Sequence, residues 1–171
     1  SIKKEFTDIE DYLASLELKM TILDNDESII SRMSQMTQKT NQFNLTTKRY
    51  TEGDMQNFID DPNSDVYAFS VADNFGDSGI TGLCIITSNG KSETAEVDTL
   101  LMSCRIIGRN IEYSFVDHVI GKMKEKKRKI LKAKYIQTQK NEQVKEFFDS
   151  CTFALIDNDD SVRNYRLDIS N

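Results

Sequence analysis

Hydrophobic periodicity switches several times along this sequence between a two-residue and a nearly four-residue repeat, a pattern found in folds that mix strands with helices. From Leu16 to Leu23 apolar and polar residues alternate, as in a half-buried strand. From Asn110 to Met123 the apolar residues recur about every four positions, which predicts an amphipathic helix. Because both patterns need an apolar partner surface, a sheet covered by helices is expected.

The same analysis predicts the other elements of a single domain, residues 1–171, of mixed α/β class with a mostly antiparallel central sheet flanked by helices. In the strand Thr94–Ser103, we expect Glu96, Asp98, Leu100 and Met102 to share one face. The turn Asp73–Gly79 is expected to close a hairpin. Further helices are predicted at Glu27–Gln38, from Thr51, and at Asn141–Ser150, and further strands at Val66–Val71, Gly79–Thr87, Ile130–Gln137, Thr152–Ile156 and Val162–Ile169.

Charge and hydropathy exclude several classes of protein. With 22 basic and 28 acidic residues, the net charge of −6 argues against a nucleic-acid binder. No apolar run approaches the roughly 20 residues that span a bilayer. The first residues lack both an initiator Met and a signal-peptide pattern, so we expect a piece of a longer cytoplasmic protein. The basic run Lys122–Lys134 has two interpretations, a solvated helix end or a docking patch for an acidic partner or a phosphate.

The loop Arg105–Asn110 lies between a predicted strand and a predicted helix. Such a turn directs several backbone N–H groups, and the positive end of the helix, at one point, which is what a pyrophosphate requires. Gly108 allows the backbone to approach a ligand closely. The sequence therefore predicts a phosphate site in this loop.

In this element order, the loop resembles the coenzyme A loop of the GNAT acyltransferases, and the segment Asn141–Phe153 is similar to the family's segment beside the pantetheine arm. The resemblance implies a GNAT-like fold in which the central strand splays open. Phe148 stands where many GNAT enzymes have a tyrosine that protonates the leaving thiolate, and Asn110 replaces a small residue. Coenzyme A, or the phosphopantetheine of a carrier protein, is then expected to contact Leu101, Met102, Ser103, Arg105, Ile106, Gly108, Arg109, Asn110, Asn141 and Phe148.

Four blocks are similar to the C-terminal half of FkbH-like proteins: Gln38–Tyr50, Asp73–Asp77, Met102–Arg109 and Tyr135–Asn141. Members of that family join a HAD-type phosphatase domain to this module. They build a glyceryl thioester on an acyl carrier protein from a phosphorylated three-carbon donor, towards methoxymalonyl-type polyketide extender units. The resemblance implies an acyl carrier protein and a HAD-type domain as partners. No Asp-x-Asp-x-Thr phosphatase motif occurs in the sequence, so no metal is assigned to this domain.

Three residues are candidates for catalysis. Cys104, beside Arg105 and at a helix N-terminus, has the setting of a nucleophilic thiolate or of a small packing residue. Glu96 and Asp98 share a strand face and suit either a general base or a solvent-facing position. Cys84 is expected in the core. His118, the only histidine, is expected to pair with a neighbour at the core boundary, and a general base is the alternative.

A polar cluster after the first helix suits hydrogen bonding to the hydroxyls or amides of a substrate, and loop capping is the alternative. The expected substrate contacts are Asn41, Asn44, Thr46, Thr47 and Asp73. Three functions are compatible with these features. The first is transfer of a small hydroxyacyl group to the arm's thiol, the second is a docking module without catalysis, and the third is amine N-acetylation by acetyl-CoA.

Overall fold

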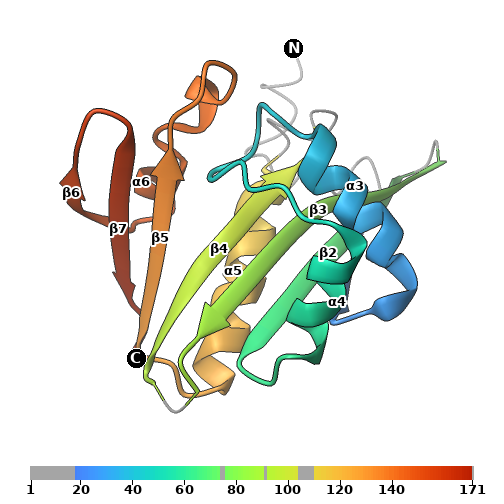
Figure 1. Ribbon diagram of the computed structural model, residues 1–171, viewed down its shortest axis with the longest axis horizontal. Helices are drawn as coiled ribbons and strands as arrows, with labels where there is room; N and C mark the ends of the chain where they lie inside the picture. The colour runs from blue at the N-terminus through green and yellow to red at the C-terminus, as the bar shows by residue number, and fades with distance from the viewer. Residues whose placement is uncertain (1–17, 74–75, 91, 104–109, 171) are drawn as a thin grey trace, which may run out of the picture.

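A computed structural model describes residues 18–73, 76–90, 92–103 and 110–170. These residues form a seven-stranded sheet in the order β1-β2-β3-β4-β5-β7-β6 (Figure 1). The strands are β1 (Lys19–Asp24), β2 (Ser64–Asp73), β3 (Gly76–Ser88), β4 (Thr94–Met102), β5 (Ile130–Ile136), β6 (Ala154–Asn158) and β7 (Val162–Asp168). Every described neighbouring pair is antiparallel except β4 and β5, so the predicted mixed, mostly antiparallel sheet is confirmed.

Helices cover both faces of the sheet. The helical elements are η1 (Glu27–Ile29), α3 (Ile30–Lys39), α4 (Glu52–Asp60), α5 (Ile111–Glu125), η3 (Glu142–Val144) and α6 (Phe147–Ser150). Helices α3 and α4 lie on one face and α5 and α6 on the other (Figure 1). None of the described helices is long and apolar enough to cross a membrane.

Of two helices predicted from the sequence, one begins where it was expected and the other is divided into two. Helix α4 starts as expected, because the Thr51 hydroxyl accepts from the N–H of Asp54 at 3.1 Å and the Asp54 carboxylate accepts from the N–H of Thr51 at 2.9 Å. The single helix predicted at Asn141–Ser150 is instead split into η3 and α6. Glu146, between them, has a φ of −107°, outside the helical range.

The core has two parts, one on each side of the sheet. Along β3, Leu83 and Ile85 pack towards α3 and α4, while Cys84 and Ile86 pack towards α5 and α6. This is the period-2 alternation expected of a central strand. The packing role predicted for Cys84 is confirmed, since the side chain is only 2% exposed.

A bulge in β4 corrects the prediction that Leu100 and Met102 share a face with Glu96 and Asp98. Ile85 of β3 pairs with Thr99 and Ile86 pairs with Val97, so Asp98 has no partner on β3. Such an extra residue shifts the alternation by one position. Leu100 and Met102 therefore join Val97 in the core under α5, and Asp98 lies on the opposite face.

The basic run Lys122–Lys134 contributes much of its charge to contacts within the fold. Lys126 pairs with Asp65 at 2.8 Å, and Arg128 donates to the Gly90 carbonyl at 3.0 Å. Further ion pairs join Lys122 to Asp24 and Lys129 to Glu93. Half of the basic residues in the run thus fasten the end of α5 and the residues after it to β1, β2 and the segment between β3 and β4.

Among the glycines that the structure describes, Gly82 is the one at which a side chain has no room, because a Cβ there would overlap the ring of Phe69. We expect Gly82→Ala to lower the free energy of unfolding by about 1–3 kcal/mol through overpacking. In urea unfolding, the control Gly121→Ala should raise it by about 0.5–1 kcal/mol, since Gly121 is helical and its Cβ would meet open space. Equal stability of the two variants would contradict this account.

Candidate active site

The parallel strands β4 and β5 pair only over a short stretch and then diverge (Figure 1). Their register runs from Thr94 opposite Ile130 to Val97 opposite Ala133. Beyond this point the edge of β4 is not bonded to β5, and the backbone groups of both strands need other partners. The opening in the sheet that the GNAT resemblance implies lies here.

A segment of the chain itself, Phe43–Thr46, fills this opening, and we call it the wedge. The N–H of Leu45 donates to the Leu100 carbonyl at 3.1 Å, and the N–H of Met102 donates to the Phe43 carbonyl at 3.0 Å. On the other side, the N–H of Ile136 donates to the Leu45 carbonyl at 2.8 Å. The wedge therefore satisfies backbone groups of both diverging strands.

Asn141 holds the wedge in place. Its Nδ2 donates to the carbonyls of Asn44 and Ile136, both at 2.9 Å. Its Oδ1 accepts from the N–H of Thr138 at 2.8 Å and from the hydroxyl of Tyr135 at 3.1 Å. An Asn side chain has two donor and two acceptor positions, so all of them are used. Asn141 is fully buried and has no group left for the ligand contact expected from the sequence.

The polar cluster expected to contact substrate divides into two groups. Asn44 and Thr46 are buried, and their side chains hold the loop itself: Asn44 bonds Thr40 and Thr47, and Thr46 donates to the Asp98 carbonyl. These contacts match the loop-capping alternative. Asn41, by contrast, lines a cavity. Asp73 lies apart from this cluster, at the end of β2 opposite Gly76.

The two candidate general bases lie in different surroundings. Asp98 accepts from the Lys48 ammonium at 2.9 Å and from the Tyr50 hydroxyl at 2.6 Å. Burial, and then the bond to Asp98, raise the pKa of Tyr50, so the phenol keeps its proton. Asp98, on β4, thus binds the segment of the chain that follows the wedge. Glu96 instead lines a second cavity of about 310 Å³ with Lys132 and Tyr165.

The expected cofactor contacts at the end of β4 are already bonded within the chain. The N–H of Met102 is taken by the wedge, and the N–H of Ser103 donates to the Thr81 carbonyl at 2.7 Å. Leu101 is fully buried and forms an isolated bridge with Asn44. Asn110 has a left-handed φ of 69° and makes no side-chain cap for α5.

Other predicted site residues lie in the core or outside the described residues. Phe148 is 1% exposed and packs on Phe153 and Tyr165, with ring centroids 5.0 and 5.5 Å away. Its phenyl ring has no exposed surface that could contact a thioester and no hydroxyl that could donate a proton to one. Five predicted residues are outside the described part of the chain and stay predictions: Cys104, Arg105, Ile106, Gly108 and Arg109.

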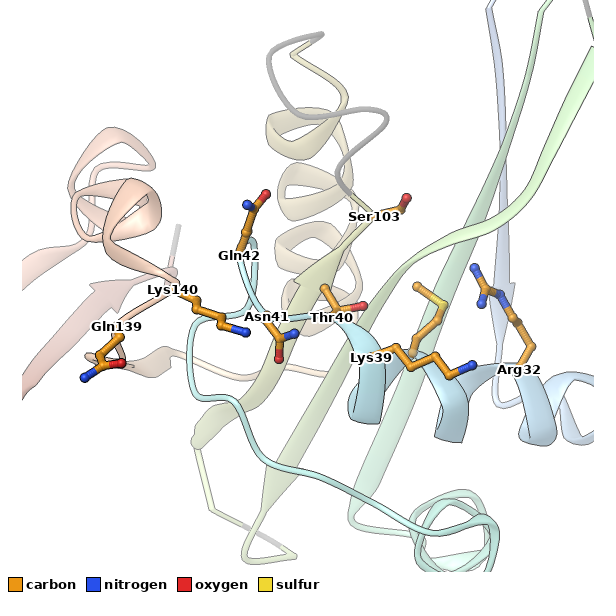
Figure 2. Close-up of a pocket in the computed structure, with 9 residues that line it drawn as sticks. Arg32, Lys39, Thr40, Asn41, Gln42, Ser103, Gln139 and Lys140 are labelled. Carbon is orange, nitrogen blue, oxygen red and sulfur yellow. The ribbon is translucent and has the colours of Figure 1, made fainter.

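A cavity of about 780 Å³ opens where β4 and β5 part (Figure 2). Ser103 lines it from the end of β4, Thr40–Gln42 from the segment before the wedge, and Gln139–Lys140 from the segment after β5. The side of α3 completes it with Arg32, Met36 and Lys39. A volume of this size suits a small-molecule ligand.

Glu112, in the first turn of α5, is a candidate that the sequence analysis missed. Its side chain is 6% exposed, and Oε2 has no hydrogen-bond partner within the described residues. Burial raises the pKa of Glu112, although the backbone N–H groups of Glu112 and Asn110 oppose the shift. A carboxylate in a first helical turn is ordinarily a surface group that complements the helix dipole, so its sequence position did not indicate burial.

The described cysteines lack the features of catalytic nucleophiles. Burial raises the pKa of the Cys151 thiol to about 12 and that of Cys84 further, so both stay protonated. His118 packs edge-on against Tyr67, with ring centroids 6.4 Å apart. Among the described residues, no three His, Cys, Asp or Glu side chains gather as metal ligands would.

No protein-family model and no curated protein matches this sequence at a significant level. Solved structures do match it. The ribosomal-protein-S18-alanine N-acetyltransferase of Escherichia coli superimposes with a TM-score of 0.67 and 11% identity, over 90% of this chain and 96% of that one. A putative GNAT-family acetyltransferase of Desulfovibrio desulfuricans gives 0.64 and 10% identity, over 88% and 99%. This chain has the GNAT acyltransferase fold.

A third similar structure bears on the cofactor. A putative acetyltransferase of Salmonella typhimurium, solved with its cofactor acetyl-CoA, superimposes with a TM-score of 0.61 and 11% identity, over 88% of this chain and 94% of that one. At such identities the likeness establishes the fold. The GNAT-like part of the sequence-based prediction is therefore confirmed, and the FkbH-like assignment stays a prediction.

The Asn141 clamp leads to a stability prediction. Asn141→Ala leaves the buried carbonyls of Asn44 and Ile136 without this donor, so we expect the free energy of unfolding to fall by roughly 2–4 kcal/mol. Hydrogen exchange should quicken at the amides of Leu45 and Ile136. Asn57→Ala, on the exposed side of α4, is the control and should change neither quantity. Unchanged exchange at Leu45 in Asn141→Ala would refute the clamp.

Glu112 leads to a prediction about pH. Because its pKa in the native state lies above the ordinary value of 4.5, its contribution to stability is complete below that value and is lost as pH rises through the native pKa. Glu112→Gln removes the ionisation, so we expect the variant to gain stability over the wild type at pH 7 and to lose that gain towards pH 4.5. Chemical unfolding at several pH values measures this. Glu52→Gln, at an exposed position in the first turn of α4, is the control and should not reproduce the trend.

Proposed function

We propose that this domain transfers an acyl group to or from the thiol of a phosphopantetheine arm, belonging to a carrier protein or to coenzyme A. The observation that supports this most directly is the 780 Å³ cavity at the point where β4 and β5 part. It lies beside Ser103, immediately before the loop in which the sequence predicts a phosphate site. A thioester or thiol at the end of such an arm would meet its reaction partner there.

The residues around the cavity suit the end of a pantetheine arm. Ser103, Thr40 and Asn41 provide hydroxyl and amide groups that hydrogen-bond the arm's amides. The arm supplies a thiol that is acylated, or a thioester that is activated for transfer. Within the chain, Arg105, Gly108 and Arg109 would bind the pyrophosphate or phosphate, as the sequence predicts.

The wedge limits how the arm is held. An arm that bonded the N–H of Met102 would compete with the Phe43 carbonyl, which already accepts from it at 3.0 Å. The wedge in turn is held by the buried Asn141. We therefore expect the arm to bind through the cavity lining and the phosphate loop, with the wedge left in place.

Phe148 supports one direction of transfer over the other. When a thioester donates its acyl group, the departing thiolate takes up a proton, and a phenylalanine cannot supply it. When a thiol is acylated, the new carbon–sulfur bond forms as the bond from the acyl carbon to the donor's leaving group breaks. The leaving group departs with that electron pair, the thiol proton passes to the leaving group or to solvent, and no acid is needed at the sulfur. The buried phenyl ring at this position favours acylation of the arm's thiol.

A small hydroxyacyl group on an acyl carrier protein is the specific form of this proposal. It rests on the FkbH-like blocks, two of which meet in space. Asn44, in the block Gln38–Tyr50, and Asn141, in the block Tyr135–Asn141, are joined at the wedge by a hydrogen bond of 2.9 Å. Residues that define the resemblance thus support one structural feature. A HAD-type phosphatase domain is the expected partner in the same chain.

Amine N-acetylation by acetyl-CoA is the second candidate. Its support is the fold, since the similar structures are acetyltransferases and one was solved with acetyl-CoA. Turnover of acetyl-CoA with amines by this domain would favour it over the carrier-protein form. If neither form of transfer occurs, the domain is a docking module, as the structural contacts of Asp98, Asn141 and Phe148 would permit.

Coenzyme A binding tests the shared part of these proposals. Calorimetric titration should show binding to the wild type, and Arg109→Ala should weaken it about tenfold at low salt through loss of a charge-assisted contact. Added salt should narrow the difference, because ions screen the contact. Arg166→Ala makes the same charge change at an exposed position of β7 and should leave the affinity unchanged.

Binding of a carrier protein distinguishes the carrier-protein form of the proposal from the general proposal that the domain binds a pantetheine arm. Carrier protein bearing the phosphopantetheine arm should bind more tightly than the apo form that lacks it. Equal affinity of the two carrier forms, together with binding of coenzyme A, would reject the carrier-protein form alone. If coenzyme A does not bind and the two carrier forms bind with equal affinity, the pantetheine proposal as a whole is rejected.

A further inference from the structure

The sheet ends, on the side away from β1, in a fully exposed edge strand. The strand order places β6 beyond β7 at this edge (Figure 1). Every residue of β6, Ala154–Asn158, is exposed. The unpaired N–H and carbonyl groups along such an edge are a template for another strand. Lysine and proline commonly prevent this pairing, and β6 contains neither.

The same strand carries two exposed aliphatic side chains. Among the described residues, the exposed large hydrophobic side chains are Leu155, at 42%, and Ile156, at 52%. A bulge leaves Ile156 without a partner on β7, because Leu155 pairs with Tyr165 and the next pair is formed by Asp157. Single exposed apolar residues are normal, but adjacent ones on an unpaired strand indicate an interaction surface.

One face of the sheet is open beside this edge. The apolar cluster beneath α3 and α4 contains residues of β2, β3 and β4 and none of β5, β6 or β7. On the other face, Ala133 of β5 and Tyr165 of β7 are buried with α5 and α6. Their neighbours Lys132 and Arg166 therefore point to the open face. No helix of the described chain covers this part of the face, so a second sheet could approach β6.

The two ends of β6 are opposite in charge. The turn at 157–160, at one end, contains three aspartates. At the other end, Ala154 pairs with Arg166, which in turn pairs with Lys132. Cross-strand partners point to the same face, so two cations lie in the row that ends at Ala154. An antiparallel contact between two copies brings the acidic end of each β6 to the basic end of the other, whereas a parallel contact brings like charges together.

We propose that this chain forms a twofold dimer in which the β6 strands of two copies pair antiparallel around Leu155 and join the two sheets into one. Both copies use the same edge, so the contact closes at two chains. The surface is complementary to itself in charge, which makes a second copy the partner that it fits best. This inference does not depend on the proposed function.

The faces of the side chains agree with this pairing. Leu155, on the face of α5 and α6, lies opposite Leu155 of the second copy. Ile156, which lines the cavity on the open face, lies opposite the small Ala154 of the second copy. Asp157 then lies two strand spacings, about 10 Å, from Arg166 of the second copy. The two side chains can meet because Ala154 leaves the space between them free.

Analytical ultracentrifugation of the whole chain tests the dimer. A contact of one short strand per copy is at the small end of specific interfaces, so we expect a dissociation constant of about 10–100 μM. Leu155→Asp places like charges together on the twofold axis and should weaken the dimer roughly a hundredfold. Ser114→Asp adds the same charge at an exposed position of α5 and is the matched control. Circular dichroism of each variant shows whether the fold is kept.

Charge reversal tests the antiparallel arrangement. Arg166→Asp and Asp157→Arg should each weaken the dimer about tenfold, because each replaces two attractive contacts of the dimer with repulsive ones. The double variant that carries both changes restores opposite charges across the contact, so its dissociation constant should return to within about threefold of the wild type. A structural role of these residues within one chain would not give this rescue.

Three results would overturn the inference. The first is a wild-type protein that stays monomeric up to about ten times the expected dissociation constant. The second is a dimer that keeps its affinity in Leu155→Asp or in both single charge reversals. The third is growth beyond two chains, which would mean that β6 pairs with a different surface of the next copy.

Discussion

The structure depends on the hydrogen bonds that the wedge makes across the opening between β4 and β5. Two parallel strands that part inside a sheet leave backbone N–H and carbonyl groups unpaired, and buried groups of this kind are costly. Phe43 and Leu45 satisfy groups of both strands, and Asn141 fixes the wedge with a side chain whose bonding positions are all used. The wedge fills only one side of the opening, and the space that remains is the cavity lined by Ser103 and Asn41.

Because the wedge fills the opening, residues that the sequence suggested for the active site have structural contacts instead. Asp98 binds Lys48 and Tyr50, Asn141 binds the wedge, and Phe148 lies in the core. Asp98 and Asn141 have chemical types suited to an active site, and all three residues have contacts that belong to the fold. The residues that retain free surface around the cavity are polar or positively charged, so binding and positioning of a ligand are the better supported tasks of this site.

The sequence predicted the elements well because burial of one face imposes a local period. The capping box at Thr51, the strand of Cys84 and the amphipathic helix α5 all follow from residues close together in the chain. The bulge at Asp98 was not predicted, although the two adjacent polar residues Asp98 and Thr99 interrupt the alternation, and one extra residue reverses every side chain after it. The cavity was also missed, because Arg32, Lys39 and Lys140 are brought together only by the fold.

The clamp on the wedge also bears on how the chain folds. The bond from Asn141 to the Asn44 carbonyl joins residues 97 positions apart, whereas the hairpin of β2 and β3 joins close neighbours. Contacts between distant residues form only after a large loss of chain entropy, and they slow folding. The first strands and helices can therefore assemble while the wedge is still free. During synthesis on the ribosome, the Asn141 clamp on the wedge cannot form until β5 and the segment after it have emerged.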